Sequence, residues 1–210
     1  MTPFIVSLTD FLITALCMVF CWKLWTQPAD KKKLNYNFFG LFCSIGIAAL
    51  LGGIVHIYGE IKGDVLNVLW MLTIINVGIS SYNLWIVNMR LMLPDSLFRY
   101  GSLIGRSFFG LYVLFVLFIN HEYYVAIVSY IPAAALLFFI LLMRSIRERN
   151  RYYLFGLGGL LLTFVAAVIQ HYRLEVVALY LDHNSLYHIV QAVGLWGLYL
   201  FGSRVSRWNI

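Results

Sequence analysis

The polar residues at positions 182–191 are the densest group of chemistry-bearing side chains in an otherwise apolar sequence. In a helix that has begun by Asn184, the side chains of Asn184, His188 and Gln191 share one face, because residues four and seven apart lie above one another. His183 stands just before that face. Imidazole and amide groups are costly against lipid, so we expect this face to point into a helix bundle or a polar cavity.

Two further ionisable side chains fall inside apolar segments. An aspartate, Asp10, lies about two helical turns into the segment 4–25, where one face is continuous in small polar side chains: Asp10, Thr14, Cys17 and Cys21. A histidine, His56, ends the segment 38–58 after a pair of glycines. Because a carboxylate within an apolar span is by default functional or locks helix packing, we expect Asp10 to face inward.

These residue types can build a zinc site. A catalytic zinc takes three protein ligands and leaves one position for water, and neutral imidazole is a common ligand. The sequence therefore predicts a metal site formed by His56, His183 and His188. Its predicted catalytic groups are Asp10 and Asn76, and its predicted supporting groups are Asn184 and Gln191, which would orient the ligands. A zinc-bound water is acidic enough for amide or ester hydrolysis near neutral pH.

The composition requires that such a site be carried by membrane helices. Hydrophobic residues make up 62% of the 210 residues and charged residues 11%, whereas a soluble domain has about 25% charged residues. The formal net charge of +6 lies in loops between apolar spans, so we expect no nucleic-acid partner. The three cysteines, Cys17, Cys21 and Cys43, lie within spans, which favours buried packing over a disulfide framework.

The apolar segments predict an all-α, multi-pass integral membrane protein with a single seven-helix transmembrane domain over residues 1–210. The predicted spans are 4–25, 38–58, 65–87, 103–119, 124–143, 153–170 and 185–202. No repeat of 20 to 50 residues is apparent, which argues against a repeat-built transporter. No lysine follows Lys62, so the last helix has no residue for a retinal Schiff base.

The basic residues predict the orientation. Seven alternating spans put two of the fifteen Lys and Arg residues, Lys62 and Arg173, on one side and thirteen on the other, and cytoplasmic loops are the ones enriched in these residues. We therefore expect the amino terminus outside and the carboxyl terminus in the cytoplasm. The same alternation places all five histidines on the outer side: His56, His121, His171, His183 and His188.

At its polar residues the chain resembles the CREST superfamily of seven-helix membrane hydrolases, which includes alkaline ceramidases and the adiponectin-receptor group. The stretch Gly52-Gly53-Ile54-Val55-His56 is similar to the helix-two motif, and Asn184-Ser185-Leu186-Tyr187-His188 is similar to the helix-seven motif. The resemblance implies a zinc ion held by three histidines and a lipid or other membrane-embedded substrate with an amide or ester bond.

The chain departs from that pattern at three positions. Gly52 stands where the superfamily has a serine, and Asn76 where it has an aspartate. Asn184 occupies the position of the first helix-seven histidine, with His183 one residue earlier. If His183 and Asp10 have replaced the missing groups, the site still binds zinc; otherwise the fold survives without catalysis.

Two other classes of function are consistent with the same residues. In a transporter or receptor, the histidines would bind a substrate or sense pH in a polar vestibule without a metal. In a haem-binding electron-transfer protein, His56 and His188 would be axial ligands from facing helices.

Overall fold

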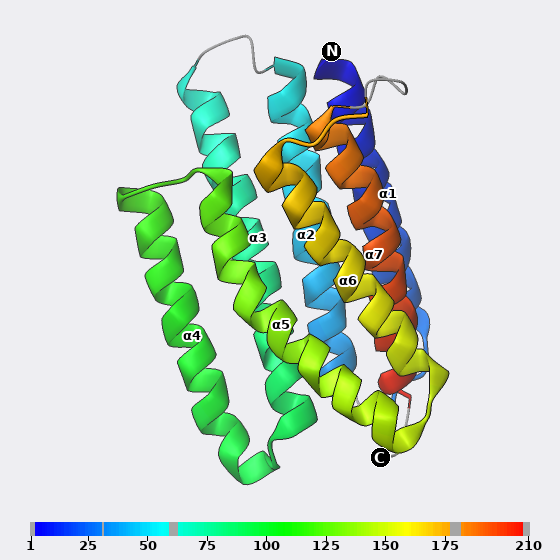
Figure 1. Cartoon of the computed structure of the whole chain (residues 1–210). Helices are drawn as coiled ribbons and strands as arrows, with labels where there is room; N and C mark the ends of the chain where they lie inside the picture. Colours follow the sequence, from blue (N-terminus) through cyan, green and yellow to red (C-terminus); the bar gives the residue numbers. More distant parts are fainter. Residues whose placement is uncertain (1–2, 31, 59–62, 177–181, 208–210) are drawn as a thin grey trace.

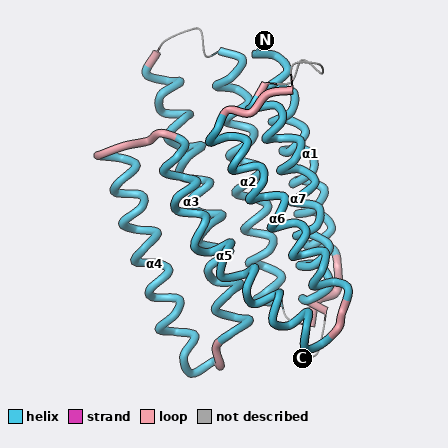
Figure 2. Tube along the Cα trace, in the orientation of Figure 1, coloured by secondary structure: helices cyan, strands magenta, loops and turns pink. Residues whose placement is uncertain are grey.

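A computed structural model describes residues 3–30, 32–58, 63–176 and 182–207. It is an all-α bundle whose described part contains seven helices (Figures 1 and 2). The helices are α1 (Pro3–Thr26), α2 (Lys32–Tyr58), α3 (Asp64–Met92), α4 (Asp95–Phe118), α5 (Tyr123–Glu148), α6 (Arg151–Tyr172) and α7 (His183–Val205).

Each predicted span corresponds to one helix, and most of the helices are longer than predicted at both ends. The largest difference is in α4, which begins at Asp95, eight residues before the predicted start at Leu103. The added turns carry Arg99 and a first-turn acid, so they are too polar to register as part of an apolar run. Helical hydrogen bonding simply continues past the hydrophobic segment.

The fold is that of a multi-pass membrane protein. Within the described residues, six helices, α1 to α6, are long and apolar enough to cross a membrane. The seventh, α7, carries the polar residues His183, Asn184, His188 and Gln191 in its first three turns. These residues lower the hydropathy of α7, and they are the same residues that suggest a site.

The helices alternate in direction, so the ends of α2, α4 and α6 lie beside the starts of α1, α3, α5 and α7 (Figure 1). We call this the N-terminal end of the bundle. The most extensive packing is between α6 and α7, between α1 and α2, and between α2 and α3. α7 also contacts α1, α5 packs against α3 and α6, and α4 lies at the edge against α3 (Figure 1). Toward the opposite end of the bundle, the core between the helices is aromatic, and Phe38, Phe42, Tyr153 and Phe201 are fully buried there.

Glycines bring α6 and α7 into direct backbone contact. A methyl group on Gly159 would lie 2.6 Å from the carbonyl oxygen of Gly194, and one on Gly197 would lie 2.7 Å from that of Phe155. Small residues let membrane helices approach this closely. The contact fixes the position of α7, and with it the side chains of Gln191 and His188, about one and two turns before Gly194.

Candidate functional site

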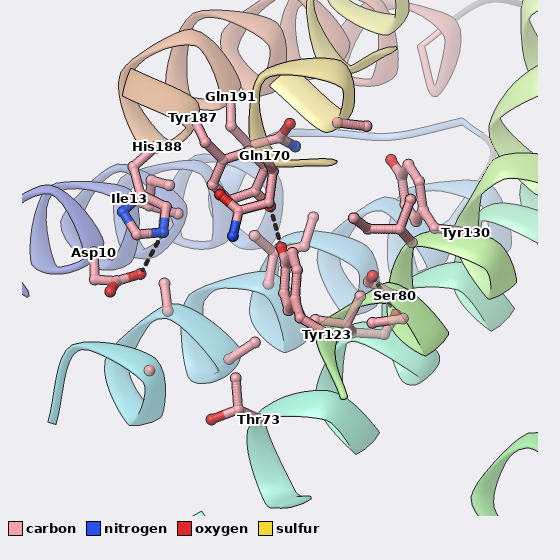
Figure 3. Close-up of a pocket in the computed structure, with 18 of the residues that line it drawn as sticks. Asp10, Ile13, Thr73, Ser80, Tyr123, Tyr130, Gln170, Tyr187, His188 and Gln191 are labelled. Atoms are coloured by element: carbon pink, nitrogen blue, oxygen red, sulfur yellow. Dashed lines mark hydrogen bonds and ion pairs between the residues drawn. The ribbon is translucent and has the colours of Figure 1, made fainter. Parts of the chain in front are cut away.

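A cavity of about 140 Å³ lies inside the bundle, lined by residues of every helix except α4. Its polar lining includes Asp10 from α1, His56 from α2, and Asn184, His188 and Gln191 from α7. Figure 3 shows Asp10, His188 and Gln191 among the lining side chains. The remaining wall is mostly aliphatic, with Ile13, Ile45, Ala49, Val77, Ala126 and Ile131 among its members. The cavity is therefore amphipathic: ionisable groups gather near the N-terminal end, and most of the remaining lining is apolar.

The Asp10 carboxylate lies between the two imidazoles. Its Oδ1 is 3.1 Å from Nε2 of His188, and its Oδ2 is 3.9 Å from Nε2 of His56. The rings of His56 and His188 have their centroids 6.5 Å apart. The side chains of Asp10 and His188 are 6% and 9% exposed, whereas that of His56 is 29% exposed. Three helices thus bring one carboxylate and two imidazoles together at the head of the cavity.

Thr9 sets the orientation of the His188 ring. Its hydroxyl donates to the carbonyl oxygen of Val6 at 2.7 Å and contacts Nδ1 of His188 at 2.9 Å. A threonine hydroxyl has a single proton to donate, so it accepts from Nδ1–H of the imidazole. The hydrogen-bond partners therefore assign the proton of neutral His188 to Nδ1 and leave the lone pair of Nε2 directed at Asp10.

In this arrangement the Nε2 lone pair of His188 faces a lone pair of the Asp10 carboxylate. Nε2 of neutral His188 and Oδ1 of ionised Asp10 both accept hydrogen bonds, and at 3.1 Å they need a proton or another cation between them. Oδ2 of Asp10 is buried and has no hydrogen-bond partner in the described part of the chain. Since buried polar atoms are almost always satisfied, a proton, a water molecule or a ligand would complete this carboxylate.

Five rings form a closed circuit around this head region. Consecutive ring centroids of His56, Trp70, Tyr123, Tyr187 and His188 are 6.4, 6.2, 6.0 and 5.0 Å apart, and His188 returns to His56 at 6.5 Å. The Tyr123 and Tyr187 hydroxyls are hydrogen-bonded to each other (Figure 3). All five side chains line the cavity, so they form an aromatic collar around its polar head.

The two glycines before His56 have different roles. A methyl group on Gly53 would lie 2.7 Å from the Phe11 ring and 3.1 Å from Cβ of Asp10, so this glycine lets α1 approach α2. A methyl group on Gly52 would lie 3.7 Å from Oδ1 of Asp10, an ordinary contact distance. Gly52 therefore leaves open space directly beside the carboxylate.

Among the predicted site residues on α7, Asn184 and Gln191 line the cavity together with His188. Asn184 accepts a hydrogen bond from the side-chain amide of Gln170 in α6 at 2.9 Å. Nδ1 of His183, the predicted third metal ligand, lies 3.6 Å from a carboxylate oxygen of Glu175. His183 is the first residue of α7, and it is not among the side chains that line the cavity in the described structure.

The structure does not bring Asn76 into the site. Its side-chain amide donates to the carbonyl oxygen of Leu72, one turn earlier in α3. The neighbouring polar residues Thr73 and Ser80 line the cavity instead.

Several residues of the site were not identified from the sequence. Thr9, which orients His188, has no motif of its own and differs from other threonines only through its neighbour in space. Trp70, Tyr123 and Tyr130 look like the aromatic residues common near membrane interfaces, where tryptophan and tyrosine are enriched. One signal was available: Tyr123 and Tyr130 are seven residues apart and share a helical face.

Within the described residues, no group of three or more His, Cys, Asp or Glu side chains is spaced so as to hold a metal ion. The set with suitable chemistry is Asp10, His56 and His188, whose two imidazoles and one carboxylate are a zinc-binding combination. The predicted zinc stays a prediction.

A family of unknown function, DUF6962, matches residues 5–207 of the chain. No curated protein and no solved structure matches the chain.

Proposed function

The chain belongs to the DUF6962 family, and we propose that it is an integral membrane hydrolase that cleaves an amide or ester bond of a lipid. The observation that carries the proposal is the buried Asp10 carboxylate between two imidazoles at the head of an amphipathic cavity. Perturbed, buried carboxylate and imidazole groups that converge in a cavity are typical of catalytic sites. The CREST-like motifs around His56 and His188 support the same class of reaction.

The proposal includes a zinc ion held by Asp10, His56 and His188. The chemistry of the donors suits zinc, because Oδ2 of Asp10 is a buried acceptor without a hydrogen-bond partner in the described residues and Nε2 of His188 directs its lone pair at the same carboxylate. Their spacing is not that of a formed metal site, so the three side chains would have to rearrange around the ion. Asp10 supplies the third donor that His183 was predicted to supply. When bound, zinc would polarise the scissile carbonyl and acidify a water molecule.

The residues of the chain would orient and exclude water around the reacting carbonyl. Thr9 holds His188 in one tautomer through Nδ1, as second-shell partners of metal-bound histidines do. Gln191 is 8% exposed and lines the cavity beside His188, where its amide would hydrogen-bond the polar part of a substrate. The aromatic collar limits access of water to the head of the cavity.

The shape and lining of the cavity support a lipid substrate. Most of the lining away from the polar head is apolar, and pockets of this kind bury an apolar chain while a few polar groups fix its orientation. We further propose that all seven helices cross the membrane, with the N-terminal end of the bundle outside. The substrate would then come from the outer leaflet.

Hydrolysis assays with detergent-purified protein test the proposal. Wild-type protein should hydrolyse at least one member of a panel of fluorogenic long-chain amides and esters. His188→Ala and Asp10→Asn should each lower kcat/KM by roughly 100-fold or more, the scale of losing an acid–base or ligand group. His121→Ala, in the loop between α4 and α5, is the matched control and should retain full activity.

Two outcomes contradict the hydrolase. One is activity that survives in His188→Ala. The other is binding of the panel without turnover by the wild type, which would favour the receptor or transporter interpretation. An absorbance spectrum of the same sample tests for haem.

A further inference from the structure

The hydroxyl of Tyr130 in α5 is a second unsatisfied polar group in the same cavity. Tyr130 lines the cavity, its hydroxyl oxygen is buried, and it has no hydrogen-bond partner within the described residues. A buried hydroxyl without a partner destabilises the folded protein, so such groups are rare unless a ligand or water completes them. The hydroxyl of Tyr112, on the neighbouring helix α4, shows the usual outcome, because it donates to the carbonyl oxygen of Ile74 at 2.8 Å.

Tyr130 lies much deeper in the bundle than the polar head. It follows Tyr123 by seven residues on α5, which is two helical turns along the same face, or roughly 10 Å of rise. Tyr123 is bonded to Tyr187, the neighbour of His188. Figure 3 shows Tyr130 on the far side of the cavity from Asp10, with Tyr123 between them. A molecule that contacts both Asp10 and Tyr130 must extend along the cavity.

Two other hydroxyls that line the cavity, those of Ser80 and Thr163, have no proton to spare for a bound molecule. The hydroxyl of Ser80 donates to the carbonyl oxygen of Val77 at 2.6 Å, and that of Thr163 donates to the carbonyl oxygen of Gly159 at 3.0 Å. Their protons are used within their own helices. Of these three hydroxyls, that of Tyr130 is the one whose proton is available to a bound molecule.

From this geometry we propose that the ligand of the cavity carries a second oxygen function, a hydroxyl or a carbonyl, part-way along its chain, and that the Tyr130 hydroxyl hydrogen-bonds to it. The inference rests on the proposed function for the identity of the head group. It adds that an unsubstituted alkyl chain is not the preferred ligand. Tyr130 is a specificity-determining residue, because its hydrogen bond distinguishes a functionalised chain from a plain one.

The test uses equilibrium binding, so it does not depend on turnover. Full-length purified protein is loaded with an environment-sensitive fluorescent fatty acid. The probe is displaced by long-chain amides that are identical except for the position of one hydroxyl along the chain, with the unsubstituted amide as reference. Tyr130→Phe removes only the hydroxyl. Tyr124→Phe is the matched control, because it makes the same change on the same helix at an exposed residue outside the cavity.

In the wild type and in Tyr124→Phe, one hydroxyl position should bind roughly tenfold more tightly than the unsubstituted amide, as expected for one buried hydrogen bond. In Tyr130→Phe that maximum should disappear, while affinity for the unsubstituted amide stays within about twofold. A flat series in the wild type would show that Tyr130 is completed by water, and would overturn the inference. A maximum that persists in Tyr130→Phe would overturn it too. A maximum at one position without hydrolysis of any amide would support the inference and contradict the hydrolase.

Discussion

Asp10 is the residue on which the chemistry of the site depends, since it is the group that both imidazoles approach. The two glycines of α2 that face it provide a direct test of its surroundings. Gly52→Ser should be tolerated, because its Cβ would lie 3.7 Å from Oδ1 of Asp10, and its hydroxyl would come within hydrogen-bond reach of the carboxylate. Activity should stay within about threefold of the wild type, a loss below the usual contribution of one hydrogen bond.

The neighbouring change Gly53→Ser is the matched comparison. Its Cβ would lie 2.7 Å from the Phe11 ring and 3.1 Å from Cβ of Asp10, so α1 must move and carry the carboxylate with it. We expect kcat/KM to fall by roughly tenfold or more, because small displacements of a positioned group are costly in catalysis. Equal effects of the two substitutions in the same assay would show that Asp10 is not held by this contact.

Residue spacing predicted which side chains share a helical face, but not which residues of other segments those side chains contact. The i, i+4, i+7 pattern of Asn184, His188 and Gln191 identified the face of α7 that lines the cavity. The sequence placed His183 just before that face and predicted it as the third metal ligand, whereas its ring lies beside Glu175 in the loop that precedes α7. Consecutive residues of a helix are rotated by about 100° about its axis. Whether the His183 side chain reaches the cavity therefore depends on the residue at which α7 begins. Asp182 caps that start by accepting from the backbone N–H of Ser185 at 2.8 Å.

At the scale of elements, the contact between α6 and α7 determines where the last helix stands. Gly159→Ala would place a methyl group 2.6 Å from the Gly194 carbonyl oxygen, a backbone atom that can move only with its helix. Overpacking of this kind costs about 1–3 kcal/mol. We expect a clear fall in the thermal unfolding temperature of the detergent-purified protein.

The control for this prediction is the adjacent residue. A methyl group on Gly158 meets nothing within 4 Å, so Gly158→Ala should leave the unfolding temperature unchanged or raise it, since alanine favours helix over glycine. If Gly159→Ala is as stable as Gly158→Ala, the backbone contact is not what positions α7.

The number of helices and their central residues were predictable because membrane spans are long and uniformly apolar. Their packing partners were not. The sequence contained the Gly156, Gly158 and Gly159 group, but nothing in its composition distinguished Gly159, which touches α7, from Gly158, which faces open space. That difference is set by the rotation of α6 about its axis, which depends on the other helices.

At the scale of the whole molecule, the orientation in the membrane decides from which leaflet a lipid reaches the cavity. The thirteen-to-two division of Lys and Arg predicts that the N-terminal end of the bundle is outside. Two of the residues on which this count depends, Lys31 and Lys62, lie outside the described residues. Reporter fusions after His121 and after Arg149 should report outside and cytoplasm respectively. Fusions that report the same side, or the reverse assignment, would contradict the proposed orientation.

Metal content measures most directly whether Asp10, His56 and His188 form one site. Elemental analysis of wild-type protein, purified in detergent without chelators and supplied with zinc, should find about one zinc per chain, as for a single three-ligand site. His56→Ala and His188→Ala should lose that zinc while remaining folded, and His121→Ala should keep it. A wild-type protein without stoichiometric metal, or a His188→Ala variant that retains the full amount, would contradict the account.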